Sequence, residues 1–275
     1  MKQLIRYNSL PLLADHVVNH PNSYYESIGV EVAHNKIVFN SVDELDIRPY
    51  DTIFINALLL EENISKLLKF KTPFHLVTGN SDFGIKSRRI QLLLSSDNLI
   101  TWAGHNLQKL ADNMLSIPIG FSETGEKRPQ SKVWPDPSAY EKNMKIVLTP
   151  LSNTNAERHS INLDKFKNVK KYIEKIPYFN YLEILAKSEY SICPRGNGVD
   201  THRVYESIAM NSVPIVRPGM LSSLYRDLGC IEIENWDALD ETALTLNKLN
   251  RDVIYLDYWK NKHIEFKKLF EQKRI

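Results

Sequence analysis

The sequence is poor in cysteine, with only Cys193 and Cys230 in 275 residues. Two cysteines are too few for a disulfide framework, and their spacing does not match that of metal ligands. Both lie beside apolar runs that are typical of strands, which predicts buried free thiols. We therefore expect a reducing compartment, and we interpret the protein as cytoplasmic.

The sequence also lacks long hydrophobic runs and an excess of one charge. No stretch reaches the ~20 apolar residues of a transmembrane helix, and polar side chains interrupt the N-terminal segment where a signal peptide would be apolar. Lys plus Arg number 35 and Asp plus Glu 33, so the formal net charge at pH 7 is +2. This balance does not favour nucleic acid as a partner.

The chain is long enough for two domains, and 43% of its residues are hydrophobic. Short β-branched runs alternate with longer helical stretches, which is typical of parallel sheets with crossover helices. Strands are expected at 36–40, 51–58, 73–79, 98–104, 116–120, 145–152, 189–193, 212–217 and 230–234. Helices are expected at 59–70, 87–94, 107–114, 164–171, 178–187, 201–210 and in the C-terminal stretch.

The expected fold class is α/β, with two Rossmann-like halves. The segment 121–143 holds three prolines, many charges and weak periodicity, so we expect it to join the halves. The first domain is expected over 1–130 and the second over 131–255. Residues 256–275 have an amphipathic helical pattern with a basic outer face. This helix is expected to pack back on the body of the protein, and peripheral contact with a membrane is the alternative.

One corner of the second half, SICPRGNGVDTHRVYESIAMNSVPIV (191–216), concentrates glycines and charged residues between an expected strand and an expected helix. Pro194 ends the strand, and Gly196, Asn197 and Gly198 favour a backbone that adopts positive φ and that a ligand can approach closely. The corner therefore lies at the carboxyl end of a parallel strand and at a helix N-terminus. Open α/β sheets bind ligands at such places, and the free N–H groups attract anions.

The charged side chains of this corner are suited to a nucleotide. Arg195 precedes the glycines and Arg203 lies in the first helical turn, so both are candidates for phosphate contacts. Glu206, three residues after Arg203, is a candidate acceptor for the hydroxyls of a ribose. Asp200 or Thr201 is expected to cap the helix, with Asp200 favoured, and Asp200 and His202 either contact the sugar or order the loop. The alternative for the charged residues is an internal ion-pair network.

Two common nucleotide-binding motifs are incomplete or missing. GNGVDT (196–201) resembles G-x-G-x-x-G, but Thr201 replaces the third glycine, and no acidic residue ends a following strand at the expected distance. A nicotinamide-dependent oxidoreductase is therefore a remote alternative. No G-x-x-x-x-G-K-[ST] sequence occurs, which excludes a P-loop.

The segment CPRGNGVDTHRVYESIAMNSVPIV closely resembles the donor-binding signature of exostosin-like glycosyltransferases, P-x-G-x-G-x-D-x-x-R-x-x-E-A followed by a P-I-V strand. Ser207 departs from this signature, which usually has alanine there. Other blocks of the family resemble segments of this chain in the same order, between about residues 50 and 240. These segments are LVTGNSDFGI (76–85), ITWAGHN (100–106), IPIGF (117–121), LSNTNAERHSI (151–161) and YLEILAKSEYSICPRG (181–196).

The resemblance implies a GT-B-type enzyme, with two Rossmann-like domains facing across a cleft, an acceptor site in the first and a nucleotide-sugar site in the second. It implies transfer of xylose, glucuronate or a hexose from a UDP-sugar to a hydroxyl of a glycan or glycoconjugate, with inversion. It also implies no obligatory metal, and no D-x-D motif stands at the end of an expected strand. Fixed positive groups and helix N-termini would then neutralise the leaving diphosphate.

The family blocks also suggest roles for residues outside the corner. Arg158 lies in a polar loop where the family has an arginine, and it is expected to bind the diphosphate together with Arg195 and the backbone of 196–198. A solvated loop arginine is the alternative for Arg158. Asp82 and His105 follow two consecutive strands of the first half and are candidates for the base that deprotonates the acceptor.

Asp82 is the first candidate, with helix capping as its alternative role, and His105 stands where the family has a different polar residue. Two other functions stay open at this point. One is a fucosyltransferase-like enzyme that uses a GDP-sugar, and the other is a catalytically silent module that binds nucleotides or glycans.

Overall fold

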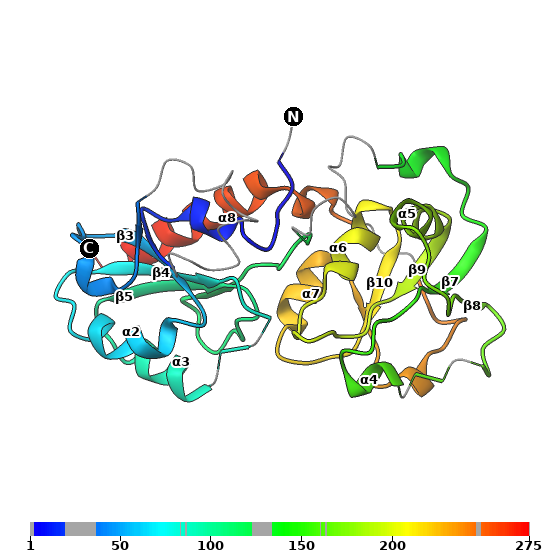
Figure 1. Cartoon of the computed structure of the whole chain (residues 1–275), viewed down its shortest axis with the longest axis horizontal. Coiled ribbons are helices and arrows are strands. Elements are labelled where there is room, and N and C mark those ends of the chain that lie inside the picture. The colour runs from blue at the N-terminus through cyan, green and yellow to red at the C-terminus, as the bar shows by residue number, and fades with distance from the viewer. Residues whose placement is uncertain are drawn as a thin grey trace. The chain divides into compact units, whose positions relative to one another are not determined.

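The computed structural model describes residues 3–19, 37–82, 84–85, 87–122, 134–159, 161–162, 164–245 and 249–274. The chain divides into two compact units (Figure 1). The first unit consists of Met1–Ile119 and Tyr255–Ile275, and the second of Gly120–Ile254. The division between the units thus lies ahead of the boundary expected at residue 130, and the C-terminal helix belongs to the first unit.

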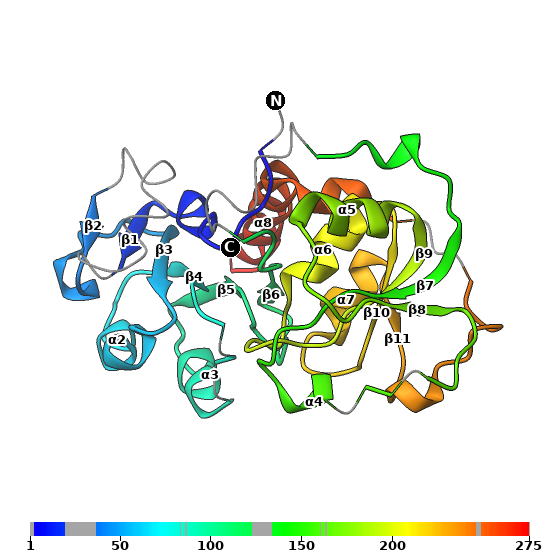
Figure 2. The ribbon, with the colours of Figure 1, turned by 45° about the vertical axis from the view of Figure 1, so that its right-hand side comes forward.

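The first unit is built on a six-stranded sheet in which all paired strands are parallel. The strand order is β2-β1-β3-β4-β5-β6. The strands are β1 (His16–Val18), β2 (Val38–Phe39), β3 (Asp51–Asn56), β4 (Phe74–Gly79), β5 (Leu99–Gly104) and β6 (Met114–Ser116). Helices α2 (Leu60–Leu67) and α3 (Ser87–Leu94) cover one face of this sheet, and α8 (Leu256–Gln272) covers the other (Figure 2). Every residue of β4 and β5 is buried, as is typical of strands between two layers of helices.

The C-terminal helix α8 is attached to the first unit at both of its ends. Near its start, the amide of Leu256 donates to the carbonyl of Gln3 at 2.8 Å. Near its end, Lys267 Nζ donates to Thr52 Oγ1 at 2.8 Å, and His75 Nε2 lies 2.9 Å from Glu271 Oε1. Burial, with the charge of Lys267, lowers the pKa of His75 to about 3, so its contact with Glu271 is a hydrogen bond from a neutral imidazole rather than an ion pair.

The second unit has a five-stranded parallel sheet in the order β11-β10-β9-β7-β8. The strands are β7 (Met144–Leu148), β8 (Val169–Lys171), β9 (Ser188–Ile192), β10 (Val213–Val216) and β11 (Ile231–Glu232). The chain runs from β7 to β8 on one side and returns to β9 on the other side of β7, so the topological switch point lies between β7 and β9. The helices are α4 (Ala156–His159), α5 (Tyr178–Ala186), α6 (His202–Ala209) and α7 (Ser222–Leu228). Cys193 and Cys230 are buried free thiols, which confirms that prediction.

The predicted α/β class with two parallel sheets is confirmed, but two predicted helices are wrong. Residues 107–113 form turns and irregular backbone that lead into β6, because the carbonyl of Asn113 accepts from the amide of Trp102 and draws the segment onto the sheet edge. The last strand of the first unit is therefore 114–116 rather than 116–120. Residues 164–171 end in the edge strand β8, which pairs with β7. In both places pairing with a neighbouring strand overrides helix propensity.

Some predictions fall on residues that are not described or on elements that the sequence did not reveal. Two of the expected segments are only partly described. The described residues do not include residue 36 of the first expected strand or residues 123–133 of the expected joining segment. Strand β1 and helix α7 were not predicted. None of the helices in the described part of the chain is long and apolar enough to cross a membrane.

Candidate active site

The segments that follow β7 and β9 meet at the switch point of the second unit. Arg158 Nε donates to the carbonyl of Arg195 at 2.8 Å, and Asn155 Nδ2 donates to the carbonyl of Gly196 at 3.1 Å. These bonds join the loop before α4 and α4 itself to the loop between β9 and α6. The structure therefore brings Arg158 to the glycine-containing corner, as the sequence predicts, in the place where open α/β sheets bind ligands.

Arg158 lies directly over the backbone of Gly196. Its Nη1 donates to both the carbonyl and the hydroxyl of Ser152, at 3.1 and 2.8 Å. A Cβ atom on Gly196 would lie 3.0 Å from Arg158 Nη2, so any larger residue at this position would require the Arg158 guanidinium to shift. The expectation of positive φ is wrong, because among the described glycines only Gly120 and Gly229 have it. Burial and the charge of Arg203 lower the pKa of Arg158, which indicates electrostatic repulsion between the two guanidinium groups.

Arg203, in the first turn of α6, has unsatisfied donors. Its Nη2 donates to the carbonyl of Pro150 at 2.9 Å, and the guanidinium lies over the ring of Tyr181, 5.5 Å from the ring centroid. Its Nε and Nη1 atoms are buried and donate no hydrogen bond to any described residue. A buried cationic donor without an acceptor is costly, and an anionic oxygen would satisfy it.

Glu206 is buried one turn further along α6. Tyr178 donates to its Oε1 at 3.1 Å, and Tyr181 donates to its Oε2 at 2.7 Å. Burial, and then the charge of Glu206, raise the pKa of Tyr181 well above its usual value, so this tyrosine stays a donor. The two tyrosine donors fix the orientation of the carboxylate, and carboxylate oxygens accept hydrogen bonds, as contact with the hydroxyls of a ribose would require.

Asp200 orders the loop instead of capping α6. Thr201, the other expected cap, is the N-cap residue but makes no side-chain cap bond, and the prediction that Asp200 caps the helix is wrong. Asp200 Oδ2 accepts from the hydroxyl of Tyr205 at 2.5 Å, and its Oδ1 accepts from Tyr225 at 3.2 Å. His202 Nδ1 lies 2.6 Å from the carbonyl of Gly120. The remaining corner residues, Arg195 and Asn197, are exposed, whereas the expected site residue Gly198 is buried.

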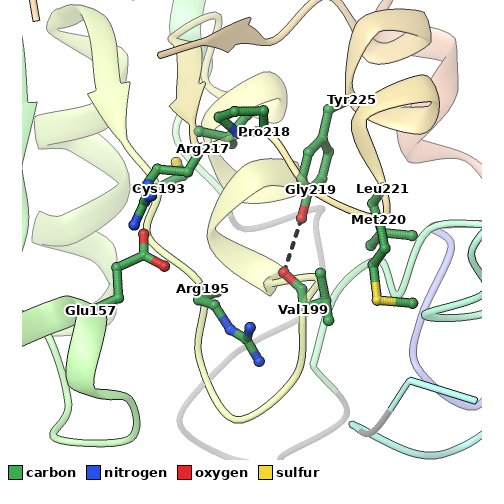
Figure 3. A pocket seen from close by; sticks show the side chains of 11 residues that line it. Glu157, Cys193, Arg195, Val199, Arg217, Pro218, Gly219, Met220, Leu221 and Tyr225 are labelled. Carbon is green, nitrogen blue, oxygen red and sulfur yellow. Dashed lines mark hydrogen bonds between the residues drawn. The ribbon is translucent and has the colours of Figure 1, made fainter. Parts of the chain in front are cut away.

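A hollow of about 400 Å³ opens between the loop after β9 and the loop after β10 (Figure 3). It is lined by Glu157, Arg195, Val199, Tyr225 and the segment 217–221, among others. Of these, the sequence pointed only to Arg195. The R-P-G sequence directly after β10 is a signal that could have been used, because it stands at the carboxyl end of the neighbouring strand.

In the first unit, the two candidate bases follow β4 and β5 at one edge of the sheet. Asn80 and Asn106, at the corresponding strand ends, both have left-handed backbone, with φ of 57° and 49°. Asn106 Nδ2 donates to the carbonyl of Ser81 at 3.0 Å, which joins the two loops. Non-glycine residues in this conformation are enriched at functional sites, so the edge is a reasonable place for a ligand.

Asp82 and His105 differ in their surroundings. His105 is 2% exposed and its ring lies 6.1 Å from that of Tyr7. Asp82 is half-buried and makes no hydrogen bond or ion pair with the rest of the described chain, so the capping role that was its alternative is not observed. An accessible carboxylate without internal partners is better placed to receive a proton than a buried imidazole.

A metal centre has no evident set of ligands in this part of the molecule. Within the residues that the structure describes, no group of three or more His, Cys, Asp or Glu side chains is arranged to hold a metal ion. The cationic groups gathered at the corner of the second unit are arginines, and arginine binds phosphate oxygens in a bidentate manner.

The fold and the corner together define an α/β protein of two parallel-sheet units whose second unit gathers arginines at its switch point. The chain belongs to the family of the RXYLT1 C-terminal domain, whose model matches residues 137–274. No curated protein matches the chain. Among solved structures, the chain is similar to that of AviGT4, a glycosyltransferase involved in avilamycin A biosynthesis. That likeness has 12% identity and a TM-score of 0.30, and it covers 92% of this chain and 96% of the other.

Proposed function

We propose that the protein is a glycosyltransferase that moves a sugar from a UDP-sugar to a hydroxyl of a glycan acceptor. The observation that carries the proposal is the set of three arginines, Arg158, Arg195 and Arg203, around the start of α6 at the switch point. Membership in the RXYLT1 C-terminal domain family and the exostosin-like signature support the same class of enzyme. Because both cysteines are free and buried, we propose that the protein is located in a reducing compartment, the cytoplasm.

The nucleotide is proposed to bind across the first two turns of α6. Glu206, oriented by two tyrosine hydroxyls, accepts hydrogen bonds from the ribose. The diphosphate lies at the helix N-terminus, where free N–H groups and the helix dipole favour negative charge. The unsatisfied Nε and Nη1 of Arg203 donate to its oxygens, and Arg158 and Arg195 add charge. Cationic side chains and the helix dipole then take the place of a metal ion, so we propose that none is required.

The proposed reaction inverts the configuration at the anomeric carbon. The acceptor oxygen forms a bond to that carbon while the bond to the diphosphate oxygen breaks, and UDP leaves with the electron pair. The acceptor proton passes to a carboxylate base, for which we propose Asp82, with His105 as the second candidate. The charge that develops on UDP is stabilised by the arginines, whose positions are fixed before the reaction begins.

A panel of nucleotides tests this function by titration calorimetry. UDP is expected to bind, and Arg195→Ala is expected to weaken it by ~1.5–3 kcal/mol, the range for a hydrogen bond to a charged group. Arg226→Ala is the matched control, because Arg226 is an exposed arginine of the same unit that pairs with Glu232 on the surface. GDP binding in preference to UDP would favour the fucosyltransferase-like alternative. Nucleotide binding without turnover of any sugar nucleotide would favour a silent binding module.

A further inference from the structure

Apart from Arg195, none of the residues that line the hollow between the loops after β9 and β10 takes part in the nucleotide contacts described so far. Its volume, about 400 Å³, lies within the ~300–1,000 Å³ range of small-molecule sites. It is closed on one side by Tyr225, whose hydroxyl donates to the carbonyl of Val199 at 3.1 Å (Figure 3). This bond joins α7 to the corner loop, so the walls on both sides of the hollow are held together.

The hollow and Glu206 lie on opposite sides of the start of α6. Glu206 faces α5, because both of its tyrosine partners belong to that helix. The hollow instead faces α7 and the end of β10, which supply Tyr225 and the segment 217–221. The β9–α6 loop, with its expected diphosphate site, lies between them. A nucleotide sugar has the same linear order, with ribose, diphosphate and sugar in succession.

We propose that this hollow binds the sugar of the donor and that Glu157 and Arg217 read its hydroxyl groups. The inference rests on the proposed function, since it takes the ribose and diphosphate positions from it. A sugar hydroxyl both donates and accepts, so a carboxylate and a guanidinium on one wall can each bind one. Val199, Leu221 and Met220 supply apolar contacts for the C–H faces of the ring.

The charges of the wall indicate an uncharged sugar. Figure 3 shows the Glu157 carboxylate and the Arg217 guanidinium pointing toward one another, whereas Arg195 extends away from them. The lining also includes Arg195, which is assigned to the diphosphate. In the part of the hollow that is left for the sugar, the negative charge of Glu157 offsets that of Arg217, so donors and acceptors are present without excess positive charge for a uronate. The ligand class is therefore a neutral pyranose, a pentose or a hexose.

Two substitutions change the hollow in independent ways. Glu157→Gln removes the anionic acceptor and preserves the size of the side chain. Gly219→Phe adds a ring to the segment 217–221 that lines the hollow. A Cβ added to Gly219 meets no atom within 4 Å, so the substitution causes no clash with the backbone, whose amide donates to Ser222 Oγ at 2.9 Å. Glu174→Gln is the control, an exposed carboxylate of the same unit that is not part of the hollow. Melting temperatures of all three variants verify that each is folded.

The experiment compares the Kd of UDP with those of UDP-xylose, UDP-glucose and UDP-glucuronate by calorimetry. We expect at least one neutral UDP-sugar to lose about tenfold or more in affinity in both hollow variants, while UDP itself stays within about twofold. UDP-glucuronate is expected to bind wild type no more tightly than UDP. Equal weakening of UDP and UDP-sugars in the variants, or no weakening of either, would overturn the inference but not the proposed function, because the wild-type protein still binds UDP. Failure of wild type to bind UDP would overturn the proposed function itself, and this inference with it.

Discussion

Replacing Arg203 with methionine separates a ligand-binding role from a structural one. Methionine keeps an unbranched apolar stem but removes the hydrogen bond to Pro150, worth ~1.5–3 kcal/mol, and the stacking on Tyr181, worth ~0.5–1 kcal/mol. It also removes two buried donors that have no acceptor, each of which costs ~1–3 kcal/mol in the unliganded protein. Because these contributions oppose one another, we expect the free energy of unfolding to change by no more than about 2 kcal/mol.

UDP affinity should respond quite differently to the same substitution. If Nε and Nη1 donate to the diphosphate, at least one charge-assisted bond is lost and the Kd for UDP rises ~10- to 100-fold. Calorimetry gives the Kd, and urea unfolding without ligand gives the stability. Arg226→Met is the control, with both quantities near wild type. A variant that is destabilised by more than ~3 kcal/mol and binds UDP normally would show that Arg203 is a structural brace.

Three further predictions concern other parts of the molecule. Asp82→Asn should lower turnover by ~10²–10⁴ with little change in UDP affinity, and a variant that keeps a tenth of wild-type turnover would remove Asp82 as the base. Glu206→Gln should weaken UDP more than 2′-deoxy-UDP, and equal losses for both in calorimetry would place the carboxylate away from the ribose. In the first unit, burial lowers the pKa of His75 to about 3 and that of His263 to about 4, below the 6.5 of the unfolded chain. Because the unfolded state takes up protons first, stability should fall as the pH drops from 6.5 toward 4, by about 2 kcal/mol per histidine near pH 5. Urea titrations across this range check the trend, and a flat profile for wild type would contradict it.

The sequence predicted the parts of the fold that depend on long local patterns. The buried runs at β3, β4 and β5 and the helix 87–94 have strong periodicities, and they form where expected. The segments 107–114 and 164–171 have helical composition, but their C-terminal ends pair with β5 and β7. Such pairing depends on the neighbouring strand, which a local pattern does not include.

The candidate site was predictable where its residues lie close together in the sequence. The glycines and charged residues of the segment 191–216 were sufficient to predict a binding site there. The resemblance to the family blocks then indicated that Arg158 belongs to the same site. The hydrogen-bond partners of Glu206 were not predictable from the sequence. Tyr178 and Tyr181 lie in α5, which precedes β9 in the chain, whereas Glu206 lies in α6, which follows it. Glu157 was missed for a similar reason, because only the fold brings it to a wall shared with the loop after β10.

The release of UDP from a set of UDP-sugars measures the central claim most directly. Many sugar transferases slowly hydrolyse their own donor, so acceptor identity is not needed for this assay. We predict that at least one UDP-sugar yields UDP with the wild-type protein and that Arg203→Met slows the release ~10-fold or more, whereas Arg226→Met does not. If no UDP-sugar is cleaved and UDP itself does not bind in calorimetry, the protein is not a UDP-sugar-dependent glycosyltransferase.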